Sequence, residues 1–302
     1  MPRMERIIAC TDLSRYADWV ETRAAMLADE LGNVSLDLLH VVRRLAPESL
    51  PYVLTQTLEE AEQRLIDSSR DQVTKTAARF SEKYGIQAVA ALKVGRIHSE
   101  VARHAEIVGA DLVILGAQSG DSVRKMFLGS TAENVLRKLT RPVLIVKQEP
   151  KTPYRRILVA VDFSESSRRA MDFAKNIASR VQITALHAFE TPTKAMLRFY
   201  GVSGETIAAY HAMVQAEKNR AMEQFVSASG AAAGPLCCLV EFGPAADIIR
   251  QKAETLESDL IVIGKHGQSE WEEMLLGSVT KQIILNADCD VLVISEESSS
   301  AV

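Results

Sequence analysis

The chain has 302 residues, of which 47% are hydrophobic and 25% charged, and at roughly 100 to 200 residues per domain this length predicts two domains. Its 35 basic and 39 acidic residues give a net charge of −4, which removes the electrostatic basis for broad binding to nucleic acid or an anionic membrane. The longest apolar runs fall far short of the roughly 20 residues that cross a bilayer, and the first eight residues lack the apolar core of a secretory signal. We therefore expect a cytoplasmic protein.

The second half of the chain repeats the first. Arg6–Asp12 returns as Arg156–Asp162, Asp111–Gly116 as Asp259–Gly264, and Val143–Val146 as Val291–Ile294, at offsets of 148 to 150 residues. Such self-similarity indicates a duplicated structural unit. We predict two tandem domains, residues 1–148 and 154–296, joined by a short linker at 148–153 that its prolines make stiff.

Within each copy, short apolar runs alternate with longer segments of helical period, a pattern typical of βαβ units around a parallel sheet. In the second copy the predicted strands lie near residues 156–161, 181–188, 236–241, 259–264 and 290–295. Between the first two strands, Ala170, Phe173, Ala174, Ile177 and Ala178 form one buried helix face. Because the strands are apolar almost throughout, both faces of each sheet should be covered, and each copy should be a doubly wound α/β domain.

The cysteines are too few for a disulfide framework and lack the CxxC spacing of zinc and redox sites. They are Cys10, Cys237, Cys238 and Cys289, mostly in or beside predicted strands. We expect them to act as small hydrophobic residues of the core.

Acidic residues follow the first strand of each copy, at the edge where such sheets bind ligands. Ligands of an open parallel sheet bind beyond the carboxyl ends of the strands, where the strand order reverses. Asp12 and Asp162 lie there, two residues before Ser14 and Ser164, which could cap the next helix. Each aspartate therefore has two interpretations: a turn or cap residue, or a carboxylate that binds a ligand.

The loop after the fourth strand of the second copy has the composition of an anion site. It runs Gly264-Lys-His-Gly267, and nine residues later Gly277-Ser278-Val279-Thr280 begin a helix. Glycines let the backbone approach a ligand closely, and the N–H groups at a helix start favour anions. Gly277 and Ser278 are thus placed to hold phosphate, although a plain helix cap would explain the same pair. The chain has no GxxxxGK[ST] run, which excludes a Walker-type site.

The histidines add one candidate to this site. His40 and His187 each end the second strand of their copy, and a structural role, with the imidazole bonded to a backbone carbonyl, explains them better than catalysis. His98 and His104 do not share a helix face. His266, inside the glycine loop, is the candidate ligand contact.

The pattern Gly264-x2-Gly267-x9-Gly277-Ser278, with Asp162 ending the first strand, resembles the nucleotide-binding pattern of the universal stress proteins. The resemblance covers two tandem copies, about residues 4–147 and 154–295. It implies in each copy a five-stranded parallel sheet of order 3-2-1-4-5 and, in members that bind nucleotide, ATP as the ligand, with Mg²⁺ held only through its phosphates. Family members commonly dimerise through their last strand, which implies that the two last strands of this chain pair as an internal pseudo-dimer. A homodimer of the whole chain is left open.

Carried over to this sequence, the resemblance gives a set of candidate nucleotide contacts in each copy. In the second copy, Asp162 and the backbone at Ala188 would hold adenine and its surroundings. The ribose and phosphates would lie against Gly264, His266, Gly267, Gly277, Ser278, Val279 and Thr280. The matching set in the first copy is Asp12, Val41, Gly116, Ser119, Gly129, Ser130 and Thr131.

The two copies differ within this pattern. Ser119 stands where the second glycine belongs, and its Cβ is unfavourable if the backbone there needs a positive φ or touches the ligand. The second copy carries three glutamates at 268–276, which repel polyphosphate unless a cation intervenes; Lys265 and Lys281 are the cations closest in sequence. We expect the second copy to be the nucleotide site, because amide contacts need the glycine geometry first and exposed charges are screened.

Three functions remain open at this point. The leading hypothesis is a non-catalytic stress-response protein that binds ATP or a related adenine nucleotide as a regulatory ligand. The alternative is a scaffold or a carrier of a small apolar ligand. The third is a slow ATP hydrolase or autokinase that would use Ser278 or Thr280, with His266 as its general base. The connection 189–204 either covers the edge of the sheet or forms a flap or partner surface.

Overall fold

The computed structural model describes residues 4–14, 16–44, 52–117, 129–177, 181–192, 194–230, 234–267 and 276–295. Domain 1 comprises β1 (Arg6–Thr11), α1 (Ala17–Leu31), β2 (Ser35–Val42), α2 (Tyr52–Tyr84), β3 (Gln87–Val94), α3 (Ile97–Val108), β4 (Leu112–Gly116), α4 (Ser130–Lys138) and β5 (Val143–Val146). Domain 2 comprises β6 (Arg156–Ala160), α5 (Glu165–Ile177), β7 (Gln182–Phe189), α6 (Lys194–Phe199), α7 (Gly204–Ala228), β8 (Leu236–Phe242), α8 (Ala245–Thr255), β9 (Leu260–Gly264), α9 (Ser278–Asn286) and β10 (Asp290–Ile294).

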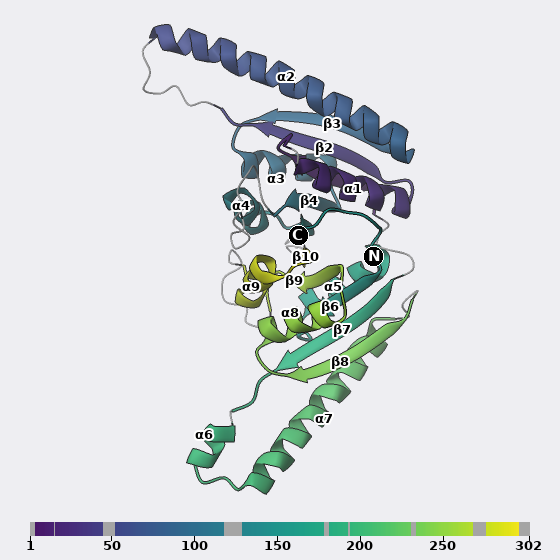
Figure 1. The fold of residues 1–302 in the computed structure, drawn as a ribbon, viewed down its shortest axis with the longest axis vertical. Helices are drawn as coiled ribbons and strands as arrows, with labels where there is room; N and C mark the ends of the chain where they lie inside the picture. The colour runs from purple at the N-terminus through teal and green to yellow at the C-terminus, as the bar shows by residue number, and fades with distance from the viewer. Residues whose placement is uncertain are drawn as a thin grey trace, which may run out of the picture.

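The strands of both domains form one ten-stranded sheet (Figure 1), in the order β3-β2-β1-β4-β5-β10-β9-β6-β7-β8. Within each domain the order is 3-2-1-4-5 and neighbouring strands are parallel, so the predicted fold class is confirmed. The two halves meet at β5 and β10, which pair antiparallel with Leu144 opposite Leu292. The strands of the two domains therefore run in opposite directions, and their carboxyl ends lie at opposite edges of the sheet.

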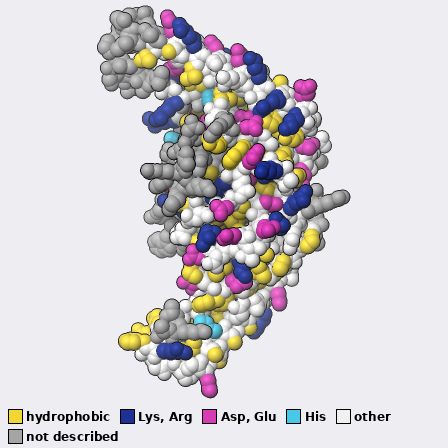
Figure 2. All heavy atoms as spheres, in the orientation of Figure 1, with side chains coloured by type: hydrophobic (Ala, Val, Ile, Leu, Met, Phe, Trp, Pro, Cys, Tyr) yellow, Lys and Arg dark blue, Asp and Glu magenta, His cyan; other side chains and the backbone are white. Residues whose placement is uncertain are grey.

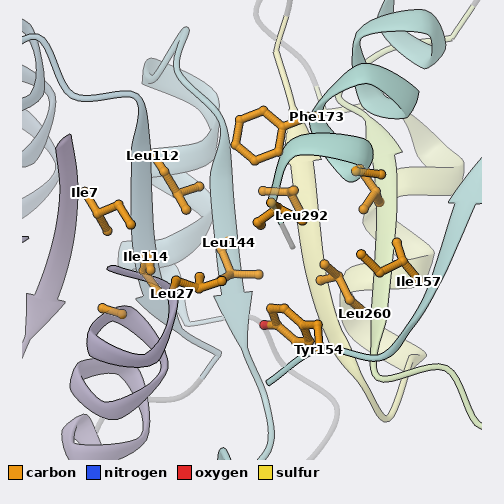
Figure 3. Close-up of a cluster of buried hydrophobic side chains, with 14 of the residues drawn as sticks. Ile7, Leu27, Leu112, Ile114, Leu144, Tyr154, Ile157, Phe173, Leu260 and Leu292 are labelled. Atoms are coloured by element: carbon orange, nitrogen blue, oxygen red, sulfur yellow. The ribbon is translucent and has the colours of Figure 1, made fainter. Parts of the chain in front are cut away.

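The hydrophobic core continues across this junction on both faces of the sheet. On one face, a single cluster joins Ile7 and Leu144 of domain 1 to Leu292 of domain 2 (Figure 3). On the other face, a second cluster joins Ile145 to Val291. The strands at the centre are apolar along their whole length because both of their faces are covered. The two domains therefore share their cores.

Two cysteines depart from the expected core role. Cys237 and Cys238 are exposed, whereas Cys289 is buried and Cys10 is partly buried. The first two lie on β8, which ends the sheet and pairs on one side with β7. An edge strand is covered less completely than a central one, so its apolar sequence did not ensure burial.

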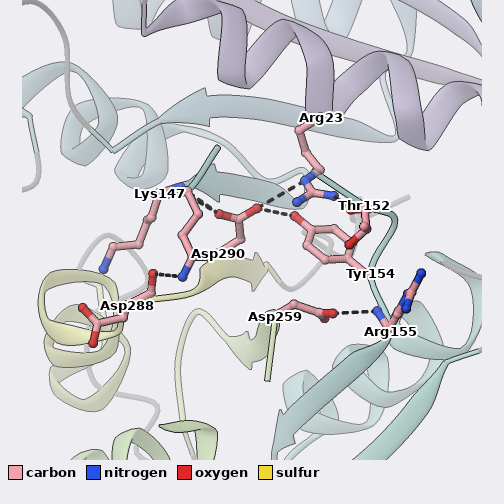
Figure 4. A network of polar contacts seen from close by, with 9 residues as sticks. Arg23, Lys147, Thr152, Tyr154, Arg155, Asp259, Asp288 and Asp290 are labelled. Carbon is pink, nitrogen blue, oxygen red and sulfur yellow. Dashed lines mark hydrogen bonds and ion pairs between the residues drawn. The ribbon is translucent and has the colours of Figure 1, made fainter. Parts of the chain in front are cut away.

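A buried polar network crosses the domain junction (Figure 4). Asp290, 1% exposed, accepts hydrogen bonds from the Tyr154 hydroxyl at 2.6 Å and the Lys147 amide at 2.8 Å. Arg23 of α1 lies 3.4 Å from the same carboxylate and donates to the Thr152 carbonyl at 3.0 Å. Burial and the adjacent carboxylate raise the pKa of Tyr154 well above its usual value, so its hydroxyl remains a donor. The network fastens domain 1, the linker and domain 2 together.

The connection after β7 forms part of an exposed apolar tip. It contains α6, whose Met196 and Phe199 are exposed, and leads to α7, whose Met213 is also exposed. Hydrophobic side chains gather at this end of the molecule in Figure 2, over α6. No described residue of the connection lines the domain 2 pocket presented below. Across the described part of the chain, no helix is both long and apolar enough to cross a membrane.

Replacing Asp290 with alanine should destabilise the protein by about 3–5 kcal/mol, because it leaves the Arg23 guanidinium buried without its counter-ion. Urea unfolding monitored by circular dichroism measures the change in the free energy of unfolding. The matched control is Glu254→Ala, which removes an exposed ion pair with Arg250 and should change stability by less than about 1 kcal/mol. Equal stability losses in the two variants would contradict the role assigned to the network.

Candidate functional site

Each domain carries a pocket beyond the carboxyl ends of its central strands, where the strand order reverses. In domain 2 the pocket lies beyond β6 and β9, has a volume of about 730 Å³ and is open to solvent. Its counterpart in domain 1 lies beyond β1 and β4, with about 770 Å³. Both lie at the position where ligands of doubly wound folds bind.

An apolar slot forms one side of the domain 2 pocket. Leu186 and Ala188 come from β7, Ala245 and Ile249 from α8, and Ile263 from β9. Two of these residues are alanines, which leave room for a flat group between β7 and α8. Sequence reasoning found Ala188 but missed the α8 residues, although α8 begins directly after β8 and so starts at the same edge of the sheet.

Asp162 lies in this pocket and also closes a turn. Its Oδ1 accepts hydrogen bonds from the amide of Ser164 at 3.0 Å and from the hydroxyl of Ser164 at 2.5 Å. Asp12 of domain 1 accepts the Ser14 amide at 3.0 Å in the same way. The turn interpretation of both aspartates is therefore correct, and each carboxyl group also lines the pocket of its domain.

The glycine positions are explained by close packing. A Cβ on Gly264 would lie 2.8 Å from the Ser166 Cβ, and one on Gly267 would lie 3.0 Å from Asp162 Oδ2. Neither glycine has a positive φ, so steric room rather than left-handed backbone requires them. Ser119, the domain 1 counterpart of Gly267, and Gln268–Leu275 with their glutamates lie outside the described residues.

Helix α9 presents its first turn to the pocket. The amides of Ser278, Val279 and Thr280 have no carbonyl partner within the described ranges, as is usual at a helix start. The Gly277 amide differs, because it donates to the Lys265 carbonyl at 3.0 Å and is not available to a ligand. The Thr280 hydroxyl donates to the Gly264 carbonyl at 2.7 Å.

The two lysines nearest to this loop are directed toward domain 1. Lys265 Nζ donates to the carbonyls of Arg137 at 3.3 Å and Leu139 at 3.2 Å, and Lys281 Nζ lies 3.9 Å from Glu133 Oε1. Neither lysine lines the pocket. Although both lysines are close to the loop in sequence, neither places its positive charge in the pocket for a ligand.

The domain 1 pocket is built from bulkier residues. Val41 and Ile97 occupy the places of Ala188 and Ala245, and Cys10 lies in its lining. Burial raises the pKa of the Cys10 thiol to about 12, so the thiol stays protonated. The predicted residues Asp12, Gly116, Gly129 and Thr131 also line this pocket, and Ser130 begins α4 beside it.

The structural role expected for His40 and His187 is confirmed. The Nδ1 atom of His40 bonds the Thr11 carbonyl at 2.8 Å, and that of His187 bonds the Val161 carbonyl at 2.7 Å. His266 instead lines the domain 2 pocket. In the described part of the chain, no group of three or more His, Cys, Asp or Glu residues is arranged to hold a metal ion.

Comparison with known proteins matches both halves of the chain to one family. Residues 4–147 and 153–295 each match the Universal stress protein family. A universal stress protein of Mycobacterium tuberculosis is 26% identical over 290 residues, covering 92% of this chain and 91% of the relative. One from Methanocaldococcus jannaschii is 29% identical over 99 residues, covering 32% of this chain and 61% of the relative.

Solved structures share the fold over the whole length. The crystal structure of a universal stress protein from Archaeoglobus fulgidus superposes with a TM-score of 0.67 at 20% identity, covering 97% of this chain and 98% of that one. A protein of unknown function from Pseudomonas aeruginosa gives a TM-score of 0.67 at 18% identity, covering 97% of this chain and 93% of that one. The tandem arrangement is therefore found in other proteins.

Acidification should destabilise the protein through His187. Burial lowers the pKa of this imidazole below 6.5 in the folded state, so the fold favours the neutral form. The resulting contribution to the free energy of unfolding is present in full above pH 6.5 and is lost as the pH falls through the lowered pKa of the folded state. Urea unfolding between pH 7.5 and 5 should show less loss of stability on acidification in His187→Gln than in wild type. Identical pH dependence in both proteins would contradict the prediction.

Proposed function

Because the chain belongs to the universal stress protein family, we propose that it binds ATP or a related adenine nucleotide in the domain 2 pocket, as a regulatory and non-catalytic ligand. One observation carries the proposal: a single pocket combines an apolar slot, an aspartate and helix-start amides that have no carbonyl partner within the described residues. The proposal concerns domain 2 first, since its slot is the wider one at the positions of Ala188 and Ala245.

The apolar slot suits a purine base. Its walls are aliphatic, with Leu186 and Ala188 on one side and Ile249 on another. Ligand sites of this kind combine predominantly apolar walls with a few polar groups that fix orientation. We assign the backbone at Ala188 to the edge of the base and the Asp162 carboxylate to hydroxyl or amino groups next to it.

The start of α9 suits the phosphates. Ser278, Val279 and Thr280 begin α9 and line the pocket, and the positive end of the helix dipole adds to the attraction of their amides for anions. Gly264 and Gly267 have no side chain to occupy the space beside them. Magnesium would be held through the phosphates, and its charge would reduce the repulsion between the phosphates and the three glutamates at 268–276.

The proposed role is regulatory because the groups of this pocket are arranged for binding. The Thr280 hydroxyl, one of the two candidate phosphate acceptors, already donates to the Gly264 carbonyl. A bound nucleotide would stabilise the folded chain by mass action, by about 2.7 kcal/mol at a concentration one hundred times Kd. Stability and exposed surface would then depend on nucleotide concentration.

Calorimetric titration with ATP, with and without magnesium, tests the proposal. Wild type should bind one nucleotide tightly, and Gly277→Val should weaken binding at least tenfold, because a Cβ there lies 3.1 Å from the Lys265 carbonyl and disturbs the loop. A change that fills the domain 1 pocket without altering α4, Val41→Phe, should leave this affinity unchanged. No adenine nucleotide binding by wild type under either condition would refute the proposal, and loss of binding in Val41→Phe alone would assign the nucleotide to domain 1.

A turnover assay separates the regulatory role from catalysis. Purified wild type should release no more phosphate from ATP than His266→Ala does, and should not phosphorylate itself, because the proposed ligand is bound without being consumed. Phosphate release that depends on His266 would contradict the regulatory role and favour a slow ATP hydrolase.

A further inference from the structure

Lys265 belongs by its backbone to the domain 2 pocket. It lies between Gly264 and His266, both of which line the pocket. Its amide donates to the Ile294 carbonyl at 2.7 Å, and its carbonyl accepts the Gly277 amide at 3.0 Å. The position of Gly277, and with it the start of α9, is therefore set by the backbone of Lys265.

The side chain of Lys265 leaves the pocket and ends in the other domain. It is 5% exposed, and Nζ donates to the carbonyls of Arg137 and Leu139. Arg137 lies in the last turn of α4 and Leu139 is the C-cap of this helix, where helix carbonyls lack intrahelical partners and the dipole favours a cation. Two directed hydrogen bonds thus fasten the glycine loop of domain 2 to a helix of domain 1.

In domain 1, whose loop residues 118–128 lie outside the described ranges, no such side-chain bond is found among the described residues. The counterpart of Lys265 is Ala117, which lines the domain 1 pocket and has no side chain long enough to cross the junction. The last turn of α9 is instead reached by Lys147, which donates to the carbonyls of Ile284 and Ala287. Lys147 follows β5 and lies outside the glycine loop. Each domain therefore caps the last helix of the other with a lysine, and among the described residues that lysine belongs to the glycine loop in domain 2 only.

The antiparallel junction explains how α4 reaches this loop. Residues at the start of α4, Gly129 and Thr131, line the domain 1 pocket. Because the carboxyl ends of the two sets of strands lie at opposite edges of the sheet, the end of α4 lies at the edge where the domain 2 pocket opens. One helix therefore runs from one pocket to the loop of the other.

We propose that Lys265 is a positioning residue through which domain 1 sets the affinity of the domain 2 pocket for nucleotide, an inference that rests on the proposed function. The loop must present the α9 amides in a fixed arrangement, and a site that is already ordered loses less entropy on binding. With Lys265 bound to α4, the corner at Gly277 is held before the ligand arrives. A change in the position of α4 then alters nucleotide affinity without touching the nucleotide.

The test compares Lys265→Met, Lys265→Arg and the control Ser295→Ala in the full chain. Ser295 Oγ donates to the same Leu139 carbonyl, at 3.4 Å, from outside the glycine loop. Titration with ATP should show binding weakened at least tenfold in Lys265→Met, largely restored in Lys265→Arg, and unchanged in Ser295→Ala. Wild-type affinity in Lys265→Met, or an equal loss in Ser295→Ala, would overturn the inference.

A second measurement needs no nucleotide. In the absence of ligand, hydrogen exchange of the Gly277 amide, which donates to the Lys265 carbonyl, should be faster in Lys265→Met than in wild type and in Ser295→Ala. Unchanged exchange would overturn the positioning role even if wild type binds no ATP. The two measurements therefore distinguish a failure of this inference from a failure of the proposed function. If Lys265→Met does not fold, Lys265→Gln, whose uncharged amide can still donate hydrogen bonds, should show the same effects at a smaller size.

Discussion

The antiparallel pairing of β5 with β10 is the constraint on which the rest of the molecule depends. It turns two five-stranded sheets into one sheet with a continuous core on each face. It also places the carboxyl ends of the strands of the two domains at opposite edges of the sheet. Each domain therefore packs the end of its last helix beside the other domain's pocket. The pairing centres on Leu144 and Leu292, which occupy equivalent positions in the two copies, so the junction has approximate two-fold symmetry.

The polar groups at the junction break this symmetry. Arg23 of α1 corresponds to Phe173 of α5, and Asp290 corresponds to Pro142. The ionic contact between Arg23 and Asp290 therefore forms on one side of the junction only, next to the linker. Pairing two copies of the same domain would leave one of these buried charges without its partner, which is costly. The divergence thus favours pairing of domain 1 with domain 2 within one chain.

The fold and the position of the pockets could be predicted from the sequence, because both features depend on the local pattern of residues and on its repetition. Apolar runs identified the strands, and Asp162 was located by its place after the first of them. The direction of the Lys265 side chain and the partner of Asp290 were not predictable, since both depend on how two domains dock. The sequence could have indicated such contacts at positions where the two copies differ, as Lys265 differs from its counterpart Ala117.

A crystal structure of the chain with a non-hydrolysable ATP analogue and magnesium tests the central claim most directly. We predict phosphate oxygens at hydrogen-bond distance, about 2.7–3.2 Å, from the amides of Ser278, Val279 and Thr280, and the base in the slot beside Ala188. An empty domain 2 pocket at saturating analogue, or phosphates bound away from the start of α9, would contradict it.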